Sequence, residues 1–312
     1  RMLTVGVDIG GTKIAAGIVD EDGTILERTR WETDAEDLAR IDGSIVAAIA
    51  ELRAGFQVGA VGVAAAGFVS PRRDSVMFAP NIAWRDYPLR DRIAESVELP
   101  IVVENDANAA GWAEFRFGAG RDVEHMVMVT IGTGVGGAII VDGHLLRGAY
   151  GVAAEIGHLK MVPNGHYCGC GHEGCWERYA SGQALTLAAR HRVTTDPEGG
   201  RAMQRIAGEG HRIKGPHVAR AAMEGDPTAL EIFGDLGRWI GMGCASLAAV
   251  LDPELIVIGG GVAEAGELFL DAARAGFVDH LSARGHRPEA RIELAVLGND
   301  AGIIGAGDLA RL

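Results

Sequence analysis

The chain has 312 residues, 48% of them hydrophobic, and is long enough for two globular domains with separate cores. Its formal net charge of -13, from 42 Asp and Glu against 29 Lys and Arg, argues against a nucleic-acid-binding protein, because such proteins gain affinity by neutralising phosphates. No apolar run reaches the ~20 residues that span a bilayer, and the N-terminal sequence does not follow the pattern of an export signal. We therefore expect a cytoplasmic protein, in a reducing compartment, with no membrane or nucleic-acid partner.

The first predicted elements occupy residues 3–28, which read as a strand, a glycine-rich turn, a second strand and a turn into a third. Apolar residues alternate from Leu3 to Ile9, as expected of a strand. A near-3.6 period of apolar residues predicts a helix within 34–54. A buried strand is expected in 60–69, and another in 99–106 that ends in polar residues before a helix over 107–118.

The same plan then restarts in residues 125–148, with strand, glycine turn, strand, turn and strand. This repeat places a domain boundary near residue 107: we expect a small α/β domain of 1–106 plus about 298–312, and a large one of 107–297. Residues 192–216 read as a polar connection, followed by helices in 216–225 and 226–252, strands in 254–261 and near 292–297, and a final helix in 301–312. Alternating strands and helices predict an α/β fold with mixed sheets, and we expect the final helix to pack on the first domain.

Four segments have the character of phosphate-binding loops, namely 8–13, 131–137, 258–262 and 299–306. Glycine lets backbone N–H groups turn toward a ligand, although each loop alone is equally compatible with a tight hairpin. Residues 132–137 match G-x-G-x-x-G, but a dinucleotide fingerprint opens a helix, and here a strand follows. Several such loops, each leaving an apolar strand, favour a nucleotide site.

The first glycine loop also carries charged side chains. Asp8 ends the first strand and is suited to hold Mg²⁺ through water, since magnesium keeps several of its waters in proteins. Lys13 is one of only three lysines in the chain, and its place beside the loop suggests a phosphate contact; the alternative is an ordinary solvated side chain.

Asn105 and Asp106 stand where a buried strand gives way to a helix. Both residue types are preferred helix N-caps, which is one interpretation of the pair. The other is a general base, because phosphoryl transfer to a sugar hydroxyl needs a carboxylate to accept its proton. The pattern alone leaves both interpretations open.

Three of the four cysteines follow C-x-C-x₄-C, at Cys168, Cys170 and Cys175. A reducing compartment and the small ring that a Cys168–Cys170 disulfide would close both favour structural zinc over disulfide or redox use. Cys244 lies in an apolar helix, where a buried structural cysteine is expected. Zinc needs a fourth ligand, and the candidates are His158, His166 and His172.

The neighbours of this cluster are acidic, including Glu155, Glu173 and Glu177, with only Lys160 and Arg178 positive. A zinc finger for nucleic acid would carry a basic surround instead. Carboxylates accept hydrogen bonds from hydroxyl groups, so these glutamates point to a ligand rich in hydroxyls. If one nitrogen of His158 binds zinc, the other is held in a fixed orientation and can face that ligand.

Together the motifs resemble the ROK family of bacterial sugar kinases, especially its actinobacterial glucokinases. The matching segments follow the family's order over nearly the whole chain: "DIGGTK" (8–13), "ENDANAA" (104–110), "IGTGVGGA" (131–138), "AEIGH" (154–158), "CGCGHEGCWE" (168–177), "YASG" (179–182) and "IVIGGGV" (256–262). The cysteine motif is the most specific of them. The resemblance implies an α/β, actin/hexokinase-like (ribonuclease H-like) fold of two domains with an interdomain cleft.

The resemblance also implies a role for individual residues. Asp106 would be the catalytic base that takes the proton of the sugar's 6-hydroxyl. The residues that bind the sugar would be Gly67, Asn81, Asn105, Asp106, Glu155, His158 and Glu177. One structural Zn²⁺ would be held by His158, Cys168, Cys170 and Cys175, with His172 as a bystander. ATP with Mg²⁺ would be bound by Asp8, Gly10, Gly11, Thr12, Lys13, Thr133, Gly134, Gly260 and Gly261.

We therefore expect an ATP-dependent glucokinase that binds glucose and ATP and assembles as a homodimer or homotetramer. Alternatives are a kinase for another hexose (mannose, fructose, allose or N-acetylmannosamine), or a glucokinase that uses polyphosphate. A non-catalytic sugar sensor is disfavoured by Asp106 and the phosphate loops, and family repressors begin with a helix-turn-helix that this sequence does not show. A zinc hydrolase would need an open metal position, which three cysteines and a histidine would close.

Overall fold

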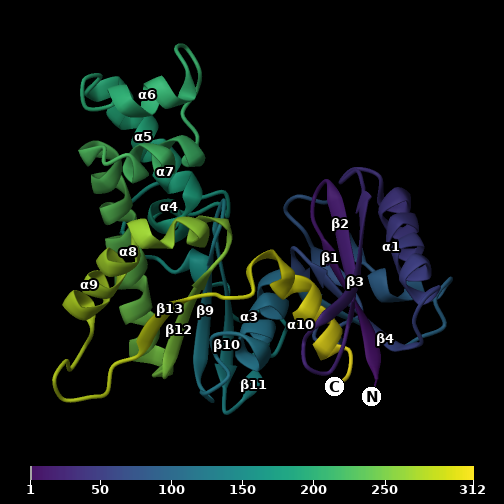
Figure 1. Ribbon diagram of the computed structural model, residues 1–312. Coiled ribbons are helices and arrows are strands. Elements are labelled where there is room, and N and C mark those ends of the chain that lie inside the picture. The colour runs from purple at the N-terminus through teal and green to yellow at the C-terminus, as the bar shows by residue number, and fades with distance from the viewer. Residues whose placement is uncertain (1) are drawn as a thin grey trace. The chain divides into compact units, whose positions relative to one another are not determined.

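The computed structural model describes residues 2–312, which form two compact units (Figure 1). Unit 1 consists of residues up to Val127, Ala138–Ala154 and Ala295–Leu312; unit 2 consists of Met128–Gly137 and Glu155–Leu294. This division differs from the expected boundary near residue 107, because the helix after that point stays with unit 1. Within the described residues, no helix is both long and apolar enough to cross a membrane.

Unit 1 is built on a five-stranded sheet with the order β3-β2-β1-β4-β8. Its strands are β1 (Leu3–Ile9), β2 (Lys13–Val19), β3 (Ile25–Glu32), β4 (Val58–Ala65) and β8 (Ile101–Asn105). β1, β4 and β8 are parallel, and their register places Asp8, Ala64 and Glu104 in one row. Since parallel strands end at the same edge, Asp8 and the residues that follow Glu104 are brought to one end of the sheet.

The two faces of this sheet are covered by different helices (Figure 1). Helix α1 (Leu38–Arg53) inserts its apolar stripe, including Ile41, Ile45 and Ile49, into a core shared with Val5 and Val7. α10 (Ala301–Leu309) lies so close to the other face that a Cβ on Gly6 would meet a helix carbonyl at 1.9 Å. The backbone approach therefore requires glycine in the strand. The expectation that the final helix packs on the first domain is confirmed.

Helix α3 (Asp106–Phe117) follows β8 directly and packs against α10, where a Cβ on Gly305 would meet the carbonyl oxygen of Ala109 at 1.7 Å. A small antiparallel sheet, β5-β6-β7, precedes β8 in the sequence, followed by a short helix, α2. These elements are β5 (Phe68–Val69), β6 (Val76–Phe78), β7 (Arg85–Tyr87) and α2 (Leu89–Ala94).

The second large sheet has the order β11-β10-β9-β12-β13. Its strands are β9 (Met126–Ile131), β10 (Val135–Val141), β11 (His144–Leu145), β12 (Leu255–Gly259) and β13 (Arg291–Leu294). β12 and β13 are parallel, whereas β10 and β11 are antiparallel, so the predicted mixed sheets are confirmed. All five residues of β12 are buried, as expected for a continuous apolar run inside a sheet.

The helices of unit 2 are α4 (Glu177–Ala180), α5 (Gly182–Thr195), α6 (Arg201–Ala207), α7 (Gly215–Met223), α8 (Pro227–Leu251) and α9 (Leu270–His280). α8 and α9 pack closely through glycines, since a Cβ on Gly241 would meet the carbonyl of Ala273 at 2.1 Å. Short 3₁₀ helices cover Ile156–His158, Gly261–Leu268 and, in unit 1, Gly298–Asp300. Leu247 of α8 is buried within the chain.

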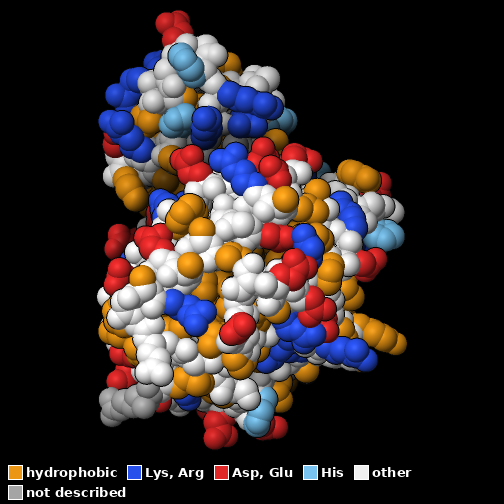
Figure 2. Space-filling model, turned by 90° about the vertical axis from the view of Figure 1, so that its right-hand side faces the viewer, with side chains coloured by type: hydrophobic (Ala, Val, Ile, Leu, Met, Phe, Trp, Pro, Cys, Tyr) orange, Lys and Arg blue, Asp and Glu red, His pale blue; other side chains and the backbone are white. Residues whose placement is uncertain are grey.

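Most predicted elements are confirmed, and one is wrong. Residues 192–216 were expected to be a polar connection, but they contain the end of α5 and all of α6. α6 buries only one side chain, that of Met203, so it leaves little apolar periodicity in the sequence. Figure 2 shows Lys, Arg and His side chains gathered over this α5–α7 region, where Arg205 and Arg220 pair with Glu224.

Candidate active site

Of the two residues that the sequence left open as caps or as a base, Asn105 is the helix cap. The Asn105 side chain caps α3 by accepting the Asn108 N–H at 3.0 Å. Asp106 is the first helical residue, and its carboxylate accepts the neighbouring Ala107 N–H at 2.9 Å. Burial raises the pKa of Asp106. A buried carboxylate with a raised pKa is a better proton acceptor than an ordinary aspartate.

Asp8 lies close enough to Asp106 for the two carboxylates to affect each other's charge. Burial, reinforced by the charge of Asp106 and opposed by Lys13, raises the pKa of Asp8 to about 6. Gly302 of α10 packs against it, and a Cβ there would lie 2.7 Å from a carboxylate oxygen. Two half-buried carboxylates that repel each other, at the carboxyl ends of parallel strands, form a site that a divalent cation would stabilise.

Gly67 is tied to the Asn105 side chain, whose amide donates to the Gly67 carbonyl at 2.9 Å. Its φ of 155° and its closeness to the Phe78 carbonyl, 2.4 Å from an added Cβ, both require glycine. Asn81 is exposed in the loop after β6. Arg85 braces that loop by donating to the carbonyls of Ala79 at 3.0 Å and Trp84 at 2.6 Å.

The glycines of the predicted nucleotide loops fall into two classes. An added Cβ on Gly11, Gly132 or Gly261 would meet nothing within 4 Å, so the fold itself does not require glycine there. The open space suits a ligand that approaches the backbone. Gly260 is needed for packing instead, because a Cβ would meet the backbone of Ile131 at 2.5 Å, whereas a Cβ on Gly134 would meet the Glu177 carboxylate at 2.5 Å and require that side chain to move. Thr133 lies between Gly132 and Gly134 in the β9–β10 turn.

The first glycine loop, with Gly10, Gly11 and Thr12, is also a hairpin turn between β1 and β2. The Gly10 N–H donates to the Lys13 carbonyl at 2.9 Å. The hairpin interpretation of this loop is therefore correct, and it does not exclude a phosphate contact at Gly11.

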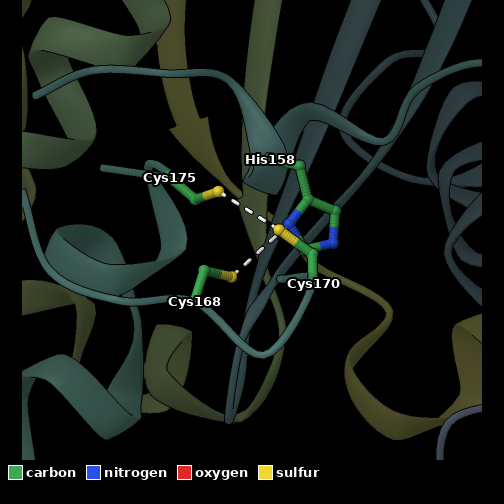
Figure 3. A group of neighbouring side chains, drawn as sticks. All are labelled: His158, Cys168, Cys170 and Cys175. Atoms are coloured by element: carbon green, nitrogen blue, oxygen red, sulfur yellow. Dashed lines mark hydrogen bonds between the residues drawn. The ribbon is translucent and has the colours of Figure 1, made fainter. Parts of the chain in front are cut away.

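The structure brings together the four predicted metal ligands, His158, Cys168, Cys170 and Cys175 (Figure 3). Their ligand atoms lie within 4.8 Å of one another, with 3.6 Å between the Cys170 and Cys175 sulfurs and 3.8 Å from the Cys168 sulfur to His158 Nδ1. Tetrahedral zinc with Zn–S bonds of about 2.3 Å separates its sulfur ligands by about 3.8 Å. The four residues therefore fit a closed zinc site in both ligand type and spacing.

His158 lies between the cysteines and two glutamates. Its Nδ1 is on the side of Cys168 and is 4.0 Å from Glu177 Oε1, while its Nε2 is 4.0 Å from Glu155 Oε2. Glu177 also accepts from the Cys168 thiol at 3.2 Å and from the Val135 N–H at 3.3 Å. The metal ligands and the two acidic side chains thus form one contiguous group within unit 2.

Two charged residues near these groups were not predicted as functional. Lys160 donates to the Cys175 sulfur at 2.8 Å. The sequence signal that could have singled it out is that Lys160 is one of only three lysines in the chain and lies close to the cysteines. Glu104 is 1% exposed at the end of β8. A carboxylate after the apolar run "IVV" is the sequence signal that would have singled it out.

Comparisons with known proteins give a consistent result. The family model described as "ROK family" matches residues 4–312. The glucokinase of Streptomyces coelicolor is 47% identical over 310 residues, which cover 99% of this chain and 98% of that protein. The crystal structure of a ROK family glucokinase from Streptomyces griseus, in complex with glucose and AMPPNP, is 49% identical with a TM-score of 0.88 and 99% coverage of both chains. The ROK hexokinase from Thermus thermophilus is 33% identical, with a TM-score of 0.82 over 99% of this chain and 98% of that one.

Proposed function

The chain belongs to the ROK family, and we propose that it is a glucokinase that transfers the γ-phosphate of ATP to the 6-hydroxyl of glucose. Full-length similarity to glucokinases supports the substrate and the reaction. Its fold is the actin/hexokinase-like α/β fold of that family. The observation within the molecule that best supports the proposal is the half-buried Asp106 carboxylate at the start of α3, where desolvation raises its pKa in the direction that suits a base.

Asp106 accepts the proton of the 6-hydroxyl as the hydroxyl oxygen attacks the γ-phosphorus. The bond between that phosphorus and the bridging oxygen of ADP breaks, so the products are glucose 6-phosphate and ADP. Phosphoryl transfer depends mainly on positioning and charge stabilisation, and the base can be a single carboxylate.

Asp8 is the residue we propose to hold Mg²⁺, through water, on the phosphates of ATP. Magnesium bound there neutralises charge that develops on the transferred phosphoryl group. The accessible backbone at Gly11 and Gly261 supports phosphate or nucleotide contacts in their loops. Gly10, Thr12, Lys13, Thr133, Gly134 and Gly260 complete the proposed nucleotide-binding set.

We assign the sugar hydroxyls to Asn105, Glu155, His158 and Glu177, and Gly67 and Asn81 complete the proposed sugar-binding set. His158, Cys168, Cys170 and Cys175 would hold one Zn²⁺, which fixes the His158 ring so that Nε2 stays on the Glu155 side. The metal acts through structure in this proposal, because four protein ligands leave no open position. Use of ATP favours the cytoplasmic location expected from the sequence, and a homodimer or homotetramer stays a prediction.

The test is a kinase assay over a panel of hexoses, with ATP and with polyphosphate as donors. We expect glucose with ATP to give the highest kcat/KM, and ADP release to require the sugar. A higher kcat/KM for mannose, fructose or N-acetylmannosamine would change the assigned sugar substrate but leave the assigned reaction, phosphoryl transfer from ATP, unchanged. Glucose binding without ADP release would instead identify a sugar sensor.

A further inference from the structure

Glu104 is a buried carboxylate that the proposed reaction does not use. Its side chain is 1% exposed, and it directly precedes Asn105 and Asp106. A charge in such a place is costly unless it is paired and hydrogen-bonded. Its partners therefore show what the fold gains from keeping it.

One oxygen of Glu104 organises the start of α3. Oε1 accepts the backbone N–H of Asn105 at 2.8 Å and the side-chain amide of Asn108 at 3.1 Å. Asn108 in turn donates its backbone N–H to the Asn105 side chain. These bonds fix the backbone on both sides of Asp106, which itself has no ion pair to a basic residue among the described contacts.

The other oxygen forms two ion pairs. Oε2 lies 2.8 Å from Nε of Arg147 and 3.2 Å from Nε of Arg73. Arg147 also donates to the carbonyls of Pro71 and Ser70, each at 3.0 Å. The Arg73 carbonyl accepts the N–H of Val103 in β8 at 3.0 Å. Three segments of unit 1 are thereby joined at this one carboxylate.

We infer that Glu104 is a positioning residue, which through Arg73, Arg147 and Asn108 holds the Asn105–Asp106 backbone where the base meets the sugar hydroxyl. The inference rests on the proposed function for the role of Asp106. The Glu104 carboxylate has two hydrogen bonds and two ion pairs, so a shift of the carboxylate would break at least one of these contacts. Displacing a catalytic group by about 1 Å can reduce a rate roughly 100-fold, which makes such a brace valuable.

A second buried carboxylate, in the α3 helix that follows β8, provides a matched control. Glu114 is 0% exposed and accepts three backbone N–H groups, from Ala119 at 3.0 Å, Val296 at 3.0 Å and Leu297 at 2.8 Å. It lies two turns further along α3 and holds the segment before α10. Glu114→Gln removes an equally buried charge without touching the contacts around Asp106.

The experiment compares Glu104→Gln with Glu114→Gln in the zinc-loaded protein, well below the unfolding temperature of each. We expect Glu104→Gln to lower kcat by about 10- to 100-fold, with a change in the KM for glucose of less than about threefold. Glu114→Gln should lower the unfolding temperature to a similar extent but keep kcat within about twofold. Hydrogen exchange of residues 105–108 should accelerate only in Glu104→Gln, which can be measured without any activity.

Wild-type kcat for Glu104→Gln, or equal exchange in the two variants, would overturn the inference. If Glu104→Gln does not fold, Arg147→Lys replaces it, because that variant keeps a positive charge but loses the paired bonds to Ser70 and Pro71. A kcat about three- to tenfold lower is then expected, and an unchanged kcat would show that the cluster is only structural. An inactive wild-type protein would refute the proposed function, whereas the exchange rates would still decide the role of Glu104.

Discussion

The region around Asp106 and the cysteine cluster are built in opposite ways. Asp106 stands at a junction of regular elements, where β8 ends and α3 begins, and buried ion pairs support it. The cysteines lie in a segment of turns with two isolated β-bridges, Lys160 with Cys175 and Tyr167 with Glu173. The first region should therefore keep its shape without a ligand, whereas the second should depend on its metal.

The largest effect is expected at Asp106. Asp106→Asn keeps the size of the side chain but cannot accept a proton, so kcat should fall by at least about 10³-fold. Zinc content should remain one ion per chain, because the cluster is built from other residues. Metal analysis and the coupled ADP assay on the same preparation measure both quantities. Turnover within tenfold of wild type would contradict the assignment of the base.

The next effect is expected from loss of zinc. Cys175→Ser should lose the metal, lower the unfolding temperature and lose activity together, since the turns around the cysteines contain little regular structure to hold His158. Cys244→Ala is the matched control, because Cys244 is buried in α8 and is not part of the cluster. A zinc-free protein that retains both stability and turnover would contradict the claim that the cysteine region depends on its metal.

The pH dependence of activity should report the carboxylates of the first region. The pKa of Asp8 is raised to about 6, so its proposed Mg²⁺ contact needs a pH above that value. We expect kcat/KM to fall as the pH is lowered through about 6, rather than near the ordinary aspartate value of about 4. Because the folded pKa is the higher one, the stability that protonated Asp8 contributes is present below about pH 4 and is lost as the pH rises through about 6. A profile that stays flat down to pH 5 would contradict this.

The smallest effect is expected at Lys160, which supports the cluster from outside. Lys160→Gln removes the hydrogen bond to the Cys175 sulfur. A competing chelator should then take zinc with an apparent affinity lower by about tenfold or less, while kcat of the zinc-loaded enzyme is unchanged. Arg178→Gln, which removes a nearby positive charge that bonds Gln183, serves as the control. Equal zinc affinity in the two variants would show that Lys160 does not support the cluster.

The sequence predicted the parts of the site that depend on local pattern. The polar end of β8 placed Asn105 and Asp106 at the edge of the sheet, and the cysteine spacing anticipated a cluster that the structure assembles. The spacing left the histidine open among His158, His166 and His172, and the family resemblance named His158. It could not predict the partners of Glu104, because Arg147 is 43 residues away and no local pattern links the two. Nor could it show that Asn105 alone would be the helix cap, since both residues of the pair are good caps.

The central claim is tested most directly by product analysis of the wild-type, zinc-loaded protein with glucose and ATP·Mg²⁺. The account predicts equal amounts of ADP and glucose 6-phosphate, with the phosphate identified on the 6-hydroxyl by glucose 6-phosphate dehydrogenase. Hydrolysis of ATP to ADP and free phosphate without a sugar phosphate, or no ADP at all, would contradict it.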